Sequence, residues 1–351
     1  MTPSAPSVAQ RPALLSWLFA EIPLGRPAAR LRDVDAARGL AIFLVVVGHV
    51  VARDMPAGNA WYEHLKDAIY LFHMPLFMVL TGITFALSLP RFADWAGVAR
   101  FSFQRLERMF IPYVVFGLII IGGKIVASRF LYVDNPPGND ALLALVVNPT
   151  VSGVTFLWFF YVLSLYMAAI PALFHLAGRR PVLLLAVSIL LNFVGPWPAY
   201  FMLNRAVEYL PFFAGGMVLW MHRAAWTRIP SGAMWAGTVL FVALLAMSPW
   251  IELPKWLVGA ASIVPVLAWM QRLPARPQDW LIALGLASMA IYLMNTIAIG
   301  VTKGVMLKLM PWDGVNFFLF FPVLTVAGLA GPMLARWLVR TCAPRLARYV
   351  G

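Results

Sequence analysis

Arg38 and His49 lie eleven residues apart in one apolar stretch of the chain, residues 35–49, and both side chains can do chemistry. The guanidinium of arginine is a permanent cation that binds phosphate and carboxylate oxygens. An imidazole, whose ordinary pKa is near 6.5, can accept or donate a proton at neutral pH. In a helix that rises about 1.5 Å per residue, the two groups would lie about 16 Å apart along the axis. This spacing suits a ligand with an anionic head, a long arm and a reactive end.

Two further groups have the same kinds of side chain. His73 lies in Ile69-Tyr-Leu-Phe-His-Met-Pro-Leu-Phe77, and Arg105 and Arg108 belong to the sequence Arg-Leu-Glu-Arg. Residues three apart can face the same way on a helix, so the two arginines could act on one ligand. Each group also has a simpler interpretation. The arginines could be ordinary interface anchors, and His73 could only bond a carbonyl of a neighbouring helix.

The composition places these residues in a membrane. Of the 351 residues, 62% are hydrophobic and 12% are charged, and the mean hydropathy is +0.81. Soluble proteins average about 25% charged residues, and the long apolar runs here are typical of polytopic helical membrane proteins. We therefore predict an all-α integral membrane protein. The net charge of +13 does not indicate a nucleic-acid partner, because the cations are spread singly and in pairs between apolar segments.

About ten transmembrane helices are expected, with proline and glycine near many of their ends. They cover approximately residues 36–53, 68–89, 109–128, 154–175, 181–195, 207–222, 232–249, 253–270, 280–300 and 315–337. Residues 1–30 have only a short apolar patch and are interpreted as a cytosolic arm or interfacial helix. Residues 31–340 would form one membrane domain, followed by a basic cytosolic tail at 341–351. The chain has one cysteine, Cys342, so neither a disulfide framework nor a metal site is expected.

The charges between the apolar segments predict an orientation. If the N-terminus is cytosolic, the whole excess of +13 falls on the inner side, and the outer segments are neutral overall. The positive-inside rule requires this asymmetry, so both termini are predicted to be cytosolic. Arg38, Arg105 and Arg108 then lie at the inner boundary, whereas His49 and His73 lie near the outer boundary on adjacent helices. The sequence thus predicts a cationic inner cluster and a histidine-bearing outer pocket.

Several motifs resemble those of the membrane acyltransferase 3 family of bacterial O-acyltransferases. They are Arg38 followed by His49, Phe72-His-Met-Pro-Leu-Phe77 with Thr81-Gly82, Arg105-Leu-Glu-Arg108 with Ile111-Pro-Tyr113, Leu157-Trp-Phe-Phe-Tyr161, Leu210-Pro-Phe-Phe-Ala-Gly-Gly216 and Ser288-Met-Ala-Ile-Tyr-Leu293. They occur in the family's order and cover about residues 31–340. Each motif is weak alone, and together they are specific. The fucose acetylase-like and exopolysaccharide-modifying branches look nearest.

The resemblance implies an enzyme of the bacterial cytoplasmic (inner) membrane that moves an acyl group, expected to be acetyl, from cytosolic acyl-CoA to a hydroxyl of an extracytoplasmic polysaccharide or lipid-linked glycan. Arg38, Arg105 and Arg108 would hold the phosphates of coenzyme A, because guanidinium forks suit phosphate oxygens. The pantetheine arm would reach His49, which would act as general base or carry the acyl group transiently. Asp35, one turn before Arg38, would be its salt-bridge partner.

Further residues complete the expected site. His73 and Asn295 are candidates for orienting the reactive histidine or polarising the thioester carbonyl. Many relatives have a histidine where this chain has Asn295, whose amide can position a hydroxyl but cannot transfer a proton. Trp158 and Tyr161 belong either to an interfacial aromatic belt or to a surface on which a sugar stacks. Glu208, near the outer end of its helix, is a candidate for binding a sugar hydroxyl.

Two other classes of function stay open from the sequence. A transporter or flippase of a glycan or small metabolite is the main alternative. Proton-coupled carriers usually have acids within their spans, whereas the candidate acids here, Asp35, Glu107 and Glu208, lie near predicted boundaries. A non-catalytic sensor or assembly subunit would be favoured only if His49 were dispensable.

Overall fold

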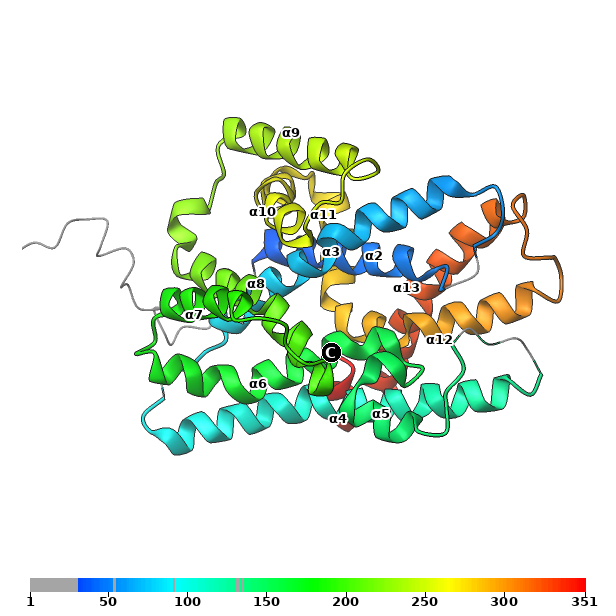
Figure 1. The fold of residues 1–351 in the computed structure, drawn as a ribbon, viewed down its shortest axis with the longest axis horizontal. Helices are drawn as coiled ribbons and strands as arrows, with labels where there is room; N and C mark the ends of the chain where they lie inside the picture. The colour runs from blue at the N-terminus through cyan, green and yellow to red at the C-terminus, as the bar shows by residue number, and fades with distance from the viewer. Residues whose placement is uncertain (1–30, 53–54, 91, 131–132, 134) are drawn as a thin grey trace, which may run out of the picture.

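A computed structural model describes residues 31–351 except 53–54, 91, 131–132 and 134, so the predicted arm at 1–30 lies outside the described residues. All regular structure in the described part is helical (Figure 1), which confirms the all-α prediction. The α-helices are α2 (Arg32–His49), α3 (Ala60–Leu87), α4 (Trp95–Ala127), α5 (Ala141–Val147), α6 (Trp158–Leu176), α7 (Pro181–Phe193), α8 (Leu203–Met221), α9 (Ser231–Met247), α10 (Lys255–Arg272), α11 (Ala275–Leu286), α12 (Ser288–Met306) and α13 (Phe317–Cys342). Short 3-10 helices lie at Pro149–Val151, Thr155–Leu157, Tyr200–Met202, Arg223–Trp226 and Pro344–Tyr349.

Five of the described helices are long and apolar enough to cross a bilayer, namely α3, α4, α6 with its preceding turn, α12 and α13. Helices α7 and α9 are apolar but shorter. The chain is therefore a multi-pass membrane protein. Of the most apolar window of each helix, 72% is buried inside the protein for α3 but only 28% for α4. Helix α3 is thus central, whereas α4 lies with α6 along one long edge of the molecule (Figure 1) and turns apolar surface outward.

Two glycines bring α3 and α8 into close contact. A Cβ atom on Gly82 would lie 2.0 Å from the carbonyl oxygen of Phe213, and one on Gly216 would lie 2.1 Å from that of Val79. Small residues allow membrane helices to approach until their backbones touch. The Thr81-Gly82 motif and the Gly216 motif are therefore explained, at their glycines, by helix packing.

The helix predicted at 280–300 is broken into α11 and α12, so that prediction was wrong in its continuity. Helix α11 crosses α2 closely, since a Cβ atom on Gly39 would lie 1.8 Å from the carbonyl oxygen of Leu281, and one on Gly285 would lie 2.1 Å from a carbonyl oxygen of α2. The chain then turns at Ala287, and α12 continues beside α2. The break allows α11 to cross α2 closely and α12 to lie beside α2.

Helix α4 begins well before its predicted start. The side chain of Asp94 caps the helix, because its Oδ1 accepts a hydrogen bond from the backbone nitrogen of Gly97 at 2.8 Å. The first helical residue is Trp95. Arg105 and Arg108 consequently lie inside α4 rather than before it, about one turn apart. Helix α3 likewise begins earlier than predicted.

A buried carboxylate ties α2 to the ends of two other helices. Asp33 is 7% exposed, and its Oδ2 accepts hydrogen bonds from Arg223 Nη2 at 2.8 Å and from Gln271 Nε2 at 3.1 Å. Arg223 follows α8, and Gln271 lies in the last turn of α10. This cluster fixes the end of α2 from which Arg38 projects.

Residues 344–351 fold back against α4 and α13. Tyr349 donates a hydrogen bond from its hydroxyl to Glu107 Oε1 at 2.9 Å, and Arg348 forms an ion pair with the same oxygen at 3.3 Å. Glu107 stands between Arg105 and Arg108 in the sequence. The segment therefore binds the acidic residue that separates the two arginines.

Candidate functional site

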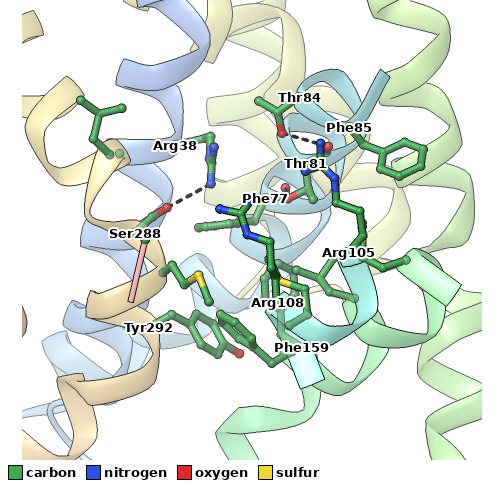
Figure 2. Close-up of a pocket in the computed structure, with 18 residues that line it drawn as sticks. Arg38, Phe77, Thr81, Thr84, Phe85, Arg105, Arg108, Phe159, Ser288 and Tyr292 are labelled. Carbon is green, nitrogen blue, oxygen red and sulfur yellow. Dashed lines mark hydrogen bonds between the residues drawn. The ribbon is translucent and has the colours of Figure 1, made fainter. Parts of the chain in front are cut away.

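Three arginines from two helices line one cavity of about 320 Å³. Arg38 projects from α2, Arg105 and Arg108 project from α4, and the three guanidinium groups point into the same space (Figure 2). Arg38 Nη2 donates to the hydroxyl of Ser288, the first residue of α12, at 3.1 Å. Arg38 Nε is buried and has no hydrogen-bond partner among the described residues. A buried donor without a partner is costly, so an anion beside Arg38 would be stabilising.

The rest of this inner cavity does not neutralise the arginines. Its wall includes Phe77 and Phe159, and no residue in its described lining is acidic. Glu107, the acid nearest in sequence to Arg105 and Arg108, is bound by the 344–351 segment instead. The cavity therefore combines positive charge with apolar walls. This combination suits a phosphate-bearing ligand with an apolar arm.

A second cavity, of about 380 Å³, contains His49. The Nδ1 atom of His49 lies 2.9 Å from Asn295 Oδ1. Asn295 is fully buried, and its amide nitrogen donates to the carbonyls of Ile291 and Tyr292 at 2.8 and 2.9 Å. The oxygen of the amide must therefore face His49, and Nδ1 must carry the proton. The remaining nitrogen, Nε2, then has a free lone pair and can accept a proton or attack a carbonyl carbon.

His73 lines the same outer cavity as His49. It is buried, and its Nδ1 donates to the carbonyl of Ile69 on its own helix at 2.7 Å. A carbonyl can only accept, so the Nε2 atom of His73 is also the unprotonated nitrogen when the ring is neutral. Its ring lies 5.1 Å from that of Tyr70. The structure thus places both histidines at one cavity with equivalent tautomers.

Tyr292 lines both cavities. Its hydroxyl donates to the carbonyl of Phe156 at 2.5 Å, and its ring contacts those of Phe159 and Phe160 at centroid distances of 5.2 and 5.3 Å. These contacts fix the ring on both sides. The arginine cavity and the histidine cavity therefore share one aromatic wall.

The two aromatic residues expected near a sugar take different places. Trp158 lines the outer cavity, with its ring 5.1 Å from that of Tyr209. Tyr161 lines neither cavity, because its hydroxyl donates to the carbonyl of Val146 at 2.7 Å and its ring packs on Tyr113. Sugar stacking is therefore geometrically open to Trp158 but not to Tyr161.

The remaining predicted residues interact with an arginine or with His49 and do not line either cavity themselves. Glu208 forms an ion pair with Arg205 at 2.7 Å and does not belong to the cavity lining, so the structure does not offer its carboxylate directly to a sugar. Asp35, one helical turn before Arg38, interacts electrostatically with it. Asn295 lies behind His49 rather than in the lining.

Several lining residues with polar or charged side chains were not predicted as site residues. Tyr292 and Ser288 belong to the motif Ser288-Met-Ala-Ile-Tyr-Leu293, and this motif was the signal from which they could have been found. Lys66 and Lys255 line the outer cavity without belonging to any such motif. Across the part of the chain that the structure describes, no group of three His, Cys, Asp or Glu side chains is placed to hold a metal ion.

The fold and the two cavities define a class of protein: a multi-pass helical membrane protein with an arginine cavity and a histidine cavity on opposite sides of one tyrosine. The family model described as an acyltransferase domain matches residues 31–337 of the chain. The chain therefore belongs to the acyltransferase 3 family, which confirms the resemblance seen in its motifs, and it is an acyltransferase at the level of the family.

Two curated proteins are similar over short stretches. One is a nodulation protein, NolL, of Sinorhizobium fredii, which is 32% identical over 105 residues, or 28% of this chain and 27% of that protein. The other is a nodulation protein NolL of Mesorhizobium japonicum, 34% identical over 77 residues, or 21% of each chain. The matches thus span about a quarter of the relatives' length or less. No solved structure matches the chain.

Proposed function

We propose that the protein is an O-acyltransferase of the bacterial cytoplasmic membrane that transfers an acyl group, acetyl in the simplest case, from cytosolic acyl-CoA to a hydroxyl of an extracytoplasmic glycan. The observation that supports this most directly is the shared wall at Tyr292 between an arginine cavity and the cavity of His49. Phosphates of coenzyme A would be bound by Arg38, Arg105 and Arg108. The thioester would then approach His49 past Tyr292.

In the simplest mechanism His49 is a general base. Its Nε2 takes the proton of the acceptor hydroxyl while the hydroxyl oxygen attacks the thioester carbonyl carbon. The carbon–sulfur bond then breaks, and the departing thiolate of coenzyme A takes the proton from the imidazolium. Alternatively, Nε2 itself attacks the carbonyl carbon, and the carbon–sulfur bond breaks so that coenzyme A leaves as its thiolate. The acceptor hydroxyl then takes the acyl group from Nε2, and its proton goes to the thiolate. Both courses use the nitrogen that Asn295 leaves free.

A glycan acceptor is supported by the outer cavity. Trp158 and Tyr209 present aromatic faces there, and Thr150 and Thr155 line it as well. Aromatic side chains combine apolar contact area with a polar edge, which suits a sugar ring. A transporter would also need a binding cavity, but it would form no covalent bond to its cargo.

The experiment that tests this function uses inverted membrane vesicles supplied with radiolabelled acetyl-CoA on their outer face. Label should appear in the glycan fraction with the wild-type chain and fall to background with His49→Ala. His64→Ala is the matched control, because His64 is an exposed histidine of α3 that lines neither cavity. Transfer that survives His49→Ala would contradict the mechanism, and uptake of glycan without label would favour the transporter.

A further inference from the structure

The outer cavity is strongly cationic, and the proposed reaction does not explain this. Lys66 from α3, Arg205 from α8 and Lys255 from α10 all line it together with the two histidines. No residue in its described lining is acidic. A neutral sugar hydroxyl needs no such charge, and cations near a membrane interior are expected to have a partner or a task.

The acids nearest to these cations neutralise them only in part. Arg205 pairs with Glu208, which lies outside the lining. Lys66 donates to the carbonyl of Val51 at 2.7 Å, and Glu63 and Asp67 act on it electrostatically from exposed positions on its own helix. Both residues are outside the lining, so a ligand in the cavity would face the cations.

Lys255 is the least compensated of the three. It forms no ion pair with any described residue, and it interacts electrostatically with His73 across the cavity. It is also the first residue of α10, whose first turn has no acidic residue. A cation at a helix N-terminus is opposed by the helix dipole. Helix stability therefore does not account for this lysine.

Arg205 repeats this arrangement. It lies in the first turn of α8, which has no acidic residue in that turn either. Its guanidinium stands over the ring of Trp158 at 5.8 Å from the centroid, beside the surface proposed for the sugar. The cavity also contains the side chain of Thr296, whose Oγ1 is buried without a hydrogen-bond partner in the described structure. The outer cavity therefore has positive charge beside the ring of Trp158, and it also contains a hydroxyl without a hydrogen-bond partner in the described structure.

We propose that the acceptor carries an anionic group, a carboxylate or a phosphate, next to the hydroxyl that is acylated, and that Lys255 and Arg205 bind this group. The inference rests on the proposed acyl transfer and names the class of its acceptor. The anion could belong to an acidic sugar of the glycan or to the phosphate of a lipid-linked glycan. In both cases the charge would hold the sugar against Trp158 with a hydroxyl near His49.

The test uses the full chain in nanodiscs, radiolabelled acetyl-CoA and three small acceptors that share their sugar hydroxyls. These are methyl α-D-glucoside, methyl α-D-glucuronide and α-D-glucose 1-phosphate, which have the hydroxyls at C2, C3 and C4 in common. We expect kcat/KM for at least one of the anionic acceptors to exceed that for the glucoside by about tenfold or more, as for a partly desolvated charge pair. Preference for the glucuronide would indicate a sugar carboxylate, and preference for the sugar phosphate would indicate a lipid-linked phosphate.

Lys255→Glu should remove this preference by lowering kcat/KM for the preferred anionic acceptor about tenfold more than kcat/KM for the glucoside. The substitution favours the α10 N-terminus, so it should not unfold the chain. Lys308→Glu is the control, since Lys308 is an exposed lysine that does not line the cavity. Equal rates for all three acceptors, or an equal loss for all three in Lys255→Glu, would overturn the inference.

A binding measurement separates this inference from the proposed reaction. Calorimetric titration of the same three acceptors without donor should show tighter binding of an anionic acceptor to the wild type than to Lys255→Glu. If no acceptor is acylated but this preference is present, the proposed reaction fails and the anion site stands. If acylation depends on His49 but binding shows no charge preference, the anion site fails and the reaction stands.

Discussion

Asn295 holds His49 in one tautomer. Its side-chain oxygen accepts from His49 Nδ1 at 2.9 Å, while its nitrogen is committed to the carbonyls of Ile291 and Tyr292. The amide cannot rotate without losing both carbonyl contacts. The amide of Asn295 therefore fixes the direction in which the ring of His49 presents its free nitrogen.

Replacing Asn295 should therefore lower the turnover number more than it affects donor binding. We expect Asn295→Ala to reduce kcat about 10- to 100-fold, the usual cost of removing a residue that orients a reactive histidine. KM for acetyl-CoA should change little, because Asn295 does not line the arginine cavity. Asn139→Ala serves as the control, because Asn139 is exposed and lines neither cavity. A large rise in KM with unchanged kcat would contradict this role.

Arg105 should affect donor affinity. Loss of one charge-assisted contact to phosphate costs about 1.5–3 kcal/mol, so Arg105→Ala should raise KM for acetyl-CoA about 10- to 100-fold. Saturating donor should restore the rate. Arg100→Ala, an exposed arginine of the same helix outside the cavity, should behave as wild type. Steady-state kinetics at several donor concentrations measure both variants.

Tyr292 should control what passes between the cavities. Tyr292→Phe loses only the hydrogen bond to the Phe156 carbonyl and should retain most activity. Tyr292→Ala removes the shared wall, so water can reach the thioester and longer acyl groups can pass. We expect acceptor-independent release of coenzyme A thiol to increase about tenfold or more, consistent with the role of water exclusion in such sites. Thiol release equal to that of the wild type would show that the ring does not separate the two spaces.

Adjacent glycines of α8 should respond in opposite ways. A Cβ atom on Gly216 would clash with the backbone of α3, whereas one on Gly215 has nothing within 4 Å. Gly216→Ala should destabilise the protein by about 1–3 kcal/mol through overpacking. Gly215→Ala should be neutral or stabilise by up to about 1 kcal/mol, because alanine is the better helix former. Thermal unfolding of the two purified variants gives the comparison.

The two ion pairs that α2 makes through Asp33 and Arg32 should differ in how much they stabilise the protein. Asp33 and Arg223 have side chains only 8% and 19% exposed, whereas Arg32 and Asp279 are 57% and 60% exposed. Asp33→Ala leaves a largely buried guanidinium without its acid and should destabilise by about 3 kcal/mol. Asp279→Ala should cost less than about 1 kcal/mol. Similar losses in the two variants would show that the Asp33 cluster is not a structural anchor.

The sequence predicted the helical membrane class, the grouping of Arg38, Arg105 and Arg108, and the grouping of His49 with His73. Hydropathy and the depth of each residue in the membrane were sufficient for this, because Arg38, Arg105 and Arg108 share one depth and His49 and His73 share another. Depth does not determine the angle around a helix axis, however. For that reason the sequence could not show that Tyr161 and Glu208, two candidates for contact with a sugar, face a backbone carbonyl and an arginine.

The break between α11 and α12 was not predictable from the apolar pattern, which runs through it. It depends on the contact of Gly285 with the backbone of α2, and a contact between distant segments leaves no local signal. The same holds for Lys66 and Lys255. In the sequence each is an ordinary lysine at a helix boundary, and only the folded structure places both at one cavity.

A charged molecule that crosses a lipid bilayer must pass through about 30 Å of hydrocarbon. In this protein the cavity of Arg38 and the cavity of His49 share Tyr292 in their linings. Under the proposed function the nucleotide and its phosphates stay on the side where they are made, and only a small uncharged fragment crosses. The cell would thus export an acyl group without losing coenzyme A and without a dedicated carrier molecule.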